Sequence, residues 1–347
     1  MNDHAPRLAV LAALVAMSAA CGEKPVPIYG EPDDTDTGSD TDTDTDTDID
    51  TDTDIDTDVD SDTDTDSDGD TDIFACDELP DGPVFVEELT GPIAYHDLAF
   101  DAEGFIVGAG GNGDVLFKAP VSGIASLWVN GIYSVQGMDF LPDGDLVAVS
   151  QSQGVVRITP EGTVSTVAAS IYGYGVQVTV GPDGMVYVGN NDTLYRIDPD
   201  THASEPLVAG LMARGCDFSP DHTRMYITSQ EGTGNIYVAE LDGEMNLVGS
   251  PMLFATIPGG GPWIDGVRVD ECGNLYVPSY SLSELWRITP EGDASLFYSW
   301  AFNPGLYGHG LKWGSGIGGW DDASIYLPQP YDGNSVVRMR LGVHYRD

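Results

Sequence analysis

The residues with the most chemistry to offer stand at the starts of six similar nine-residue units. They are a carboxylate, a guanidinium, an amide, two imidazoles and one valine, in chain order His96, Gln136, Val176, Arg214, Asp265 and His309. Polar groups of these types that converge in a concavity form the default kind of ligand site. If the units align in space, the sequence therefore predicts a polar ring, in which Gln177 replaces Val176 if the register shifts by one residue.

The sequence leaves three arrangements of this ring open. In the first, Arg214 and Asp265 form an ion pair that closes the centre. In the second, the ring binds a small anionic or sugar-like ligand, with Arg214 as a bidentate donor. In the third, His96 and Asp265, joined by His309 or Asp97, hold Zn²⁺ and activate a water for hydrolysis. The spacing assigns no catalytic residue.

The unit that positions these residues is a strand, an acidic turn and a second strand. Asp265–Gly273 followed by Asn274–Val277 is the clearest copy, and its turn is closed by glycine. The unit starts lie 40, 40, 38, 51 and 44 residues apart along the chain. Periods of this length with strand-turn-strand content are typical of a propeller rather than of separate domains.

Two further strands follow in each unit. The third strand ends in a basic residue followed by Ile or Val, as in Trp286-Arg287-Ile288, and a turn such as Pro160–Gly162 leads to the fourth. Six units of four strands predict an all-β fold, a six-bladed β-propeller over residues 76–347 with no helix. Phe85–Thr90 is expected to pair with Val336–Arg340 and to close the ring.

Two of the units, Arg214–Tyr226 and Asp265–Val277, resemble successive blades of the gluconolactonase/regucalcin family. The similarity of architecture extends over most of residues 85–343. The resemblance implies a six-bladed propeller with a divalent metal in its central channel. Many members of that family are lactone or ester hydrolases.

The family holds its metal with a Glu, an Asn and an Asp. Asp265 matches the Asp, whereas Arg214 stands at the Asn position and His96 at the Glu position. The resemblance thus implies one Ca²⁺ or Zn²⁺ with Asp265 and His96 as ligands, although an arginine beside a hard cation adds a repelling charge. Because two ligands of three differ, our leading hypothesis is a ligand-binding or scaffolding module with a degenerate site. The alternative is a metal-dependent lactone or ester hydrolase.

The first residues predict export. Arg7 precedes an apolar run, Leu8–Met17, that is too short to span a bilayer, and small residues then lead to Cys21. This ending resembles a bacterial lipobox, which implies cleavage after residue 20, a lipid on Cys21 and a membrane anchor. Gly22 after the cysteine implies an outer-membrane lipoprotein of the cell envelope. An ordinary signal peptide that leaves Cys21 free is the other interpretation.

Residues 21–75 are predicted to be a disordered acidic tether. Its Asp-Thr-rich part, residues 31–72, carries twenty Asp, one Glu and no Lys or Arg, and it contains too few apolar residues to form a core. The whole chain has a formal net charge of -44, which repels nucleic acid. We expect a monomer whose ligand is a small molecule or a protein.

The remaining cysteines lie in an oxidising compartment if the chain is exported. Cys216 is expected inside an inner strand as a buried thiol. Cys76 and Cys272, at the start of the domain and in a turn, are the more accessible pair, and we predict a disulfide between them.

Overall fold

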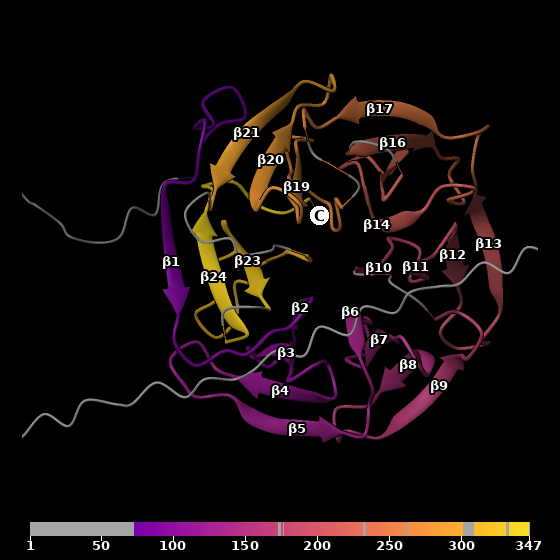
Figure 1. Cartoon of the computed structure of the whole chain (residues 1–347), viewed down its shortest axis with the longest axis vertical. Helices are drawn as coiled ribbons and strands as arrows, with labels where there is room; N and C mark the ends of the chain where they lie inside the picture. The colour runs from indigo at the N-terminus through magenta and orange to yellow at the C-terminus, as the bar shows by residue number, and fades with distance from the viewer. Residues whose placement is uncertain are drawn as a thin grey trace, which may run out of the picture. The chain divides into compact units, whose positions relative to one another are not determined.

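The computed structural model describes residues 73–172, 175, 177–231, 234–259, 261, 263–300, 309–330 and 333–346. All of them belong to the second of two compact units, Asp66–Asp347. Within these residues the fold is all-β, with six four-stranded antiparallel sheets. Figure 1 shows the sheets as blades around a common axis. The prediction of a six-bladed β-propeller is confirmed.

The blades follow one another along the chain, and each runs from an inner strand to an outer one. The first three are β2 (Leu98–Phe100), β3 (Ile106–Gly110), β4 (Val115–Ala119) and β5 (Ser126–Asn130); β6 (Val135–Phe140), β7 (Leu146–Ser150), β8 (Gly154–Ile158) and β9 (Val164–Ala168); and β10 (Val178–Val180), β11 (Val186–Asn190), β12 (Thr193–Ile197) and β13 (Ser204–Ala209).

The last three blades continue the pattern with one change, since the outer strand of the sixth comes from the start of the domain. They are β14 (Ala213–Phe218), β15 (Arg224–Ser229), β16 (Asn235–Glu240) and β17 (Met252–Thr256); β18 (Arg268–Val269), β19 (Leu275–Ser279), β20 (Glu284–Ile288) and β21 (Ala294–Ser299); and β22 (Lys312–Trp313), β23 (Ser324–Gln329), β24 (Ser335–Arg340) and β1 (Phe85–Leu89).

The ring closes through β1, which pairs antiparallel with β24 from Phe85 opposite Arg340 to Leu89 opposite Val336. This is the pairing expected from the sequence. It joins the two ends of the propeller in one sheet, so the last blade contains strands from both ends.

The core consists of six apolar clusters, each formed by two neighbouring blades. Between the first two blades, for example, Leu116 packs with Met138 and Leu146. Strands in the middle of a blade, such as β3, β7 and β19, are buried along their whole length because both faces of the blade pack against neighbouring blades, whereas outer strands such as β9 and β17 border solvent. The inner strands occupy equivalent positions in the six blades. The first residue of each unit therefore lies at one end of the axis, and the turn after the strand lies at the other.

The segment before β1 is attached to the propeller by several contacts. Cys76 forms a disulfide with Cys272 in the β18–β19 turn, with their Cα atoms 5.5 Å apart, and this is the pair predicted from the sequence. The amide of Phe74 donates to the carbonyl of Gly342, and an Arg287 guanidinium nitrogen lies 2.5 Å from the carbonyl oxygen of Pro80. Cys216 is a buried free thiol.

The export signal, Cys21 and the acidic tether lie outside the described residues, apart from Ile73, Phe74 and Ala75 at the tether's end. Among the residues that the structure covers, no helix is long and apolar enough to cross a membrane.

Candidate functional site

One end of the axis holds a cavity of about 280 Å³, which we call the first mouth. It brings together all five ligand-binding residues predicted from the sequence, and its principal lining residues are His96, Gln136, Arg214, Trp263, Asp265 and His309. The sixth ring position, Val176, is not among the described residues. Each of the five predicted side chains is buried, so they form the floor of the cavity rather than its edge.

Asp265 is the centre of this floor. It is 1% exposed, and its Oδ2 lies 2.5 Å from Nδ1 of His309. Because a carboxylate only accepts hydrogen bonds, Nδ1 of His309 is the donor. The other carboxylate oxygen, Oδ1, lies 3.7 Å from Nε of Arg214. Oδ2 is therefore hydrogen-bonded to His309, whereas Oδ1 has a basic neighbour but no hydrogen bond among the described residues.

His96 and Gln136 complete the floor from the first two blades. The His96 ring meets the His309 ring edge to face with centroids 4.3 Å apart, and Nδ1 of His96 is buried with no hydrogen bond among the described residues. The Gln136 amide donates to Oγ of Ser134 at 3.2 Å. A buried ring nitrogen without a partner is the kind of atom that a bound water or ligand satisfies.

Aromatic side chains form the wall of the first mouth. The Arg214 guanidinium lies over the Trp263 ring at 5.2 Å, and Tyr280 lies 4.9 Å from the His309 ring. Trp263 is 39% exposed, so one part of its surface remains open to solvent. An aromatic wall beside paired donors and acceptors is suited to a ring-shaped polar ligand.

The donor set does not fit the metal that the resemblance implied. The described residues contain no group of three or more His, Cys, Asp or Glu side chains that could hold an ion. Asp265, the residue that matches the family, is hydrogen-bonded to His309 through Oδ2, and the Arg214 guanidinium beside Oδ1 repels a cation. The chemistry of the site therefore does not support a metal ion held by Asp265 and His96.

Two residues adjacent in the sequence, His96 and Asp97, have pKa values that are shifted in opposite directions. Burial, aided by His309 and Arg214, lowers the pKa of His96 from 6.5 to about 2. Burial raises the pKa of the neighbouring Asp97 from 3.8 to about 7. His96 therefore favours the folded state above pH 6.5 and loses this effect as the pH falls, whereas Asp97 favours it at low pH and loses the effect as the pH rises to 7.

Single substitutions should separate these two effects. As the pH falls from 6.5 to 4.5, we expect the free energy of unfolding of Asp97→Asn to decrease relative to that of the wild type, and that of His96→Gln to increase. Each change should be about 1.4 kcal/mol per pH unit. Urea unfolding at several pH values measures both, and groups common to all three proteins cancel. Parallel pH profiles for the two variants and the wild type would contradict the assignment.

Asp97 itself belongs to a second set of polar residues that the sequence reasoning did not identify. Three aspartates accept a hydrogen bond from the next blade's backbone at 2.9–3.0 Å: Asp97, which directly precedes β2, from Met138; Asp139 of β6 from Val180; and Asp217 of β14 from Val269. The third arrangement of the predicted ring used Asp97 as a metal ligand. In the structure it lies behind the ring and links two blades.

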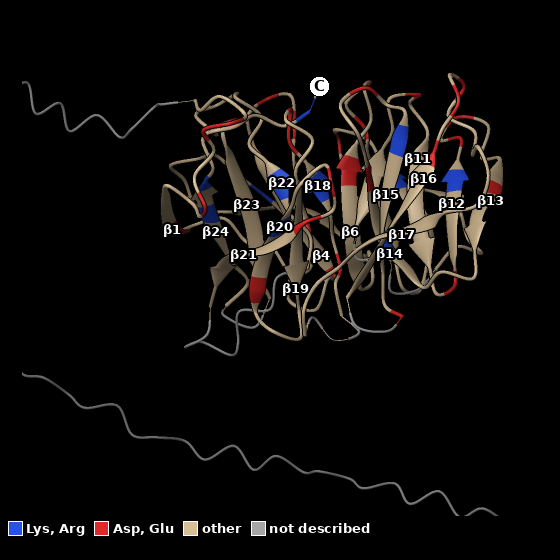
Figure 2. Ribbon diagram, turned by 90° about the horizontal axis from the view of Figure 1, so that it is seen from above, with Lys and Arg blue, Asp and Glu red and all other residues tan. Residues whose placement is uncertain are grey.

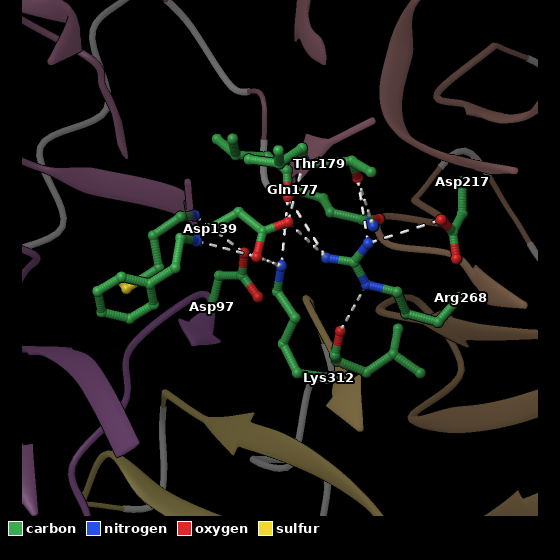
Figure 3. Close-up of polar contacts among 12 residues, drawn as sticks. Asp97, Asp139, Gln177, Thr179, Asp217, Arg268 and Lys312 are labelled. Atoms are coloured by element: carbon green, nitrogen blue, oxygen red, sulfur yellow. Dashed lines mark hydrogen bonds and ion pairs between the residues drawn. The ribbon is translucent and has the colours of Figure 1, made fainter. Parts of the chain in front are cut away.

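Further members of this set stand at the fourth position of the repeated unit. There the structure brings Asp139, Thr179 and Asp217 together with Arg268 and Lys312 (Figure 3). Figure 2 shows the basic residues of β18 and β22 within the propeller. The sequence contains a signal for this second set, because polar or charged residues recur at the fourth position of successive units as regularly as at the first.

Gln177 joins the two sets. Its Oε1 accepts from the amide of Val267 at 2.7 Å and its Nε2 donates to the carbonyl of Val267 at 2.8 Å. It is thus a link across the axis and is absent from the lining of the first mouth. Glycine at the second position of other units makes room for such links, since a Cβ at Gly310 would overlap Oδ1 of Asp97.

Comparisons with known proteins agree with this architecture. Residues 173–301 match the model of the SMP-30/Gluconolactonase/LRE-like region. A search of curated proteins finds no match to the chain. The resemblance stated from the sequence is confirmed by that region and by the structural neighbours, which include gluconolactonases and regucalcin.

Three solved structures illustrate the range of proteins with this fold. A gluconolactonase from Xanthomonas campestris is 16% identical with a TM-score of 0.57, over 75% of this chain and 87% of that one. A calcium-binding protein, regucalcin, from Agrobacterium tumefaciens is 16% identical with a TM-score of 0.60, over 75% and 95%. An auxiliary nutrient binding protein from Bacteroides ovatus is 14% identical with a TM-score of 0.55, over 73% and 76%. At these identities the likeness shows the fold alone.

Proposed function

From a propeller that carries an SMP-30/gluconolactonase-like region, we infer a binding module whose first mouth takes a small sugar-like ligand. We further propose that an exported chain, lipidated at Cys21 and tethered by residues 21–75, presents this module at the outer membrane of the cell envelope. The neighbours with this fold include a nutrient binding protein as well as enzymes, so the fold is compatible with binding alone.

One observation carries the proposal. The Arg214–Asp265 pair lies at the floor of a cavity of about 280 Å³, beside Trp263, which is 39% exposed. A guanidinium donates and a carboxylate accepts, so the pair can exchange hydrogen bonds with two neighbouring hydroxyl groups. The apolar face of a sugar ring packs on an aromatic ring such as that of Trp263.

The size and charge of the cavity limit which ligands it can bind. Its volume lies just below the range of about 300–1,000 Å³ that is typical of drug-sized ligands, which favours a single sugar ring. Asp265 offsets the charge of Arg214, and His96 is neutral because its pKa is lowered to about 2. A neutral ligand suits this floor better than a carboxylate, which Asp265 would repel.

The test is a titration of the full chain with D-glucose, followed by ligand-observed NMR. We expect Arg214→Gln to raise the dissociation constant about tenfold or more, which corresponds to one lost hydrogen bond to a charged group. Arg224→Gln is the matched control, since Arg224 lies in the next strand of the same blade and pairs with Glu240 at the surface. Equal affinities of the two variants, or no binding by the wild type, would reject the proposal.

A second candidate, hydrolysis of a lactone or ester, is favoured by the contact between Asp265 and His309. An imidazole that a carboxylate orients through Nδ1 is the arrangement of a general base. The test is the hydrolysis rate of D-glucono-1,5-lactone with the wild type and with His309→Gln, with and without added Ca²⁺ or Zn²⁺. Wild-type rates no higher than that of buffer under every condition would exclude this candidate.

A further inference from the structure

The opposite end of the axis holds a larger hollow, which we call the second mouth. Its volume is about 640 Å³, within the range of small-molecule sites. Its lining includes Asp139, Phe140, Arg268, Lys312, Trp313 and Arg346. The turns that follow the inner strands surround it, and the last described residues of the chain, Tyr345 and Arg346, contribute to its wall.

The second mouth concentrates positive charge in a strongly acidic protein. The chain has 13 Lys and Arg against 57 Asp and Glu, yet three of the 13 meet here. Lys312 Nζ lies 2.9 Å from Asp139, and Arg346 lies 2.8 Å from Asp217. Arg268 is between the two carboxylates, at 3.6 Å from Asp139 and 3.8 Å from Asp217. Three cations thus share two carboxylates.

A third carboxyl group near this cluster, that of Asp97, does not neutralise the excess positive charge. Asp97 is 1% exposed, and its pKa is raised to about 7, so it is largely protonated below neutral pH. Its Oδ1 makes no hydrogen bond among the described residues. Burial lowers the pKa of Lys312, and the nearby positive charge of Arg268 lowers it further. An added negative charge at this end would relieve that repulsion.

Most of the remaining lining is apolar or aromatic. Phe140, Leu141 and Trp313 line the hollow together with the ring of Tyr345. Trp313 and Tyr345 lie with their ring centroids 5.6 Å apart. His222 also lines this mouth, in the position that glycine takes in most units, and its φ of 57° lies in the left-handed region. Backbone strain of this kind is found often at binding sites.

We propose that the second mouth binds a small organic carboxylate with an aromatic or other apolar body. The carboxylate contacts Lys312 and Arg346, and the apolar body packs against Trp313 and Tyr345. Because these cations are at most 7% exposed, water competes poorly for them, and an anion gains more there than at the protein surface. This site is separate from the first mouth, and it does not depend on the function proposed for it.

Benzoate is the probe, added to the full chain and followed by ligand-observed NMR. We expect saturable binding by the wild type, and a dissociation constant raised about tenfold or more in Lys312→Gln. Lys118→Gln is the matched control, since Lys118 makes a 2.8 Å ion pair with Asp101 and neither residue lines this mouth. Benzyl alcohol, which lacks the charge, and inorganic phosphate, which lacks the apolar body, should not displace benzoate.

Each contrary result would overturn the proposal in a distinct way. Equal losses in Lys118→Gln and Lys312→Gln would show a general charge effect, and displacement by phosphate would show a site for charge alone. A loss of benzoate affinity in Arg214→Gln would show that benzoate binds in the first mouth. If Lys312→Gln lowers the melting temperature too far, Arg346→Gln provides the same comparison, and unchanged affinity in that variant would also reject the site.

Discussion

Replacing Asp217 by alanine is expected to destabilise the propeller by about 3–5 kcal/mol, the effect of breaking a buried ion pair from one side. Asp217 is fully buried. Its Oδ2 accepts from the amide of Val269, and its Oδ1 accepts from the Tyr345 hydroxyl at 2.9 Å and from Arg346. Without this carboxylate, Arg268 and Arg346 would remain in the interior with one partner fewer.

Urea unfolding at pH 7 measures this effect. Asp221→Ala is the control, since Asp221 lies in an exposed turn of the same blade and accepts hydrogen bonds from Ser219 and Thr223. A turn contact of this kind contributes about 1 kcal/mol. A loss of less than that in Asp217→Ala would mean that the interior ion pairs do not hold the blades together.

Removal of the disulfide is expected to have the second large effect. The Cys76–Cys272 bridge spans a sequence separation of 196 residues. Restriction of so long a loop in the unfolded chain corresponds to a stabilisation of about 2–5 kcal/mol. The double variant with serine at both positions should therefore unfold at a lower urea concentration than the wild type.

Reduction provides the internal control for the disulfide. The wild type under reducing conditions should match the double variant, and the double variant should be insensitive to reductant. Cys216→Ser removes the buried free thiol instead and should keep the sensitivity to reductant. An identical unfolding midpoint for the wild type with and without reductant would contradict the expected contribution of the bridge.

The repeat made most of the fold predictable. Its period, its Pro-Asp-Gly turns and its alternating strands are local features, and six copies leave few architectures to choose from. The closing pair of β1 and β24 followed from the need to complete the last blade. The convergence of His96, Gln136, Arg214, Asp265 and His309 followed in the same way, because equivalent positions in a ring face the same end of the axis.

The partners of these residues were less predictable. That Asp265 contacts both Arg214 and His309 depends on side-chain conformations across three blades, which no spacing encodes. The second mouth did not follow from the predicted ring, because Asp139, Arg268 and Lys312 stand at the fourth position of their units and not at the first. Arg346 also contributes to it from outside the repeat, by folding back onto Asp217 from the end of the chain.

We propose that the first mouth is a site for a sugar-like ligand, which hydrogen-bonds to the Arg214–Asp265 pair. The most direct measurement is a crystal structure of the full chain soaked with D-glucose. We expect a sugar ring in contact with Trp263, with hydroxyl groups within hydrogen-bond distance of Arg214 and Asp265. A metal ion bound to Asp265, or a first mouth without the sugar at saturating concentration, would contradict it.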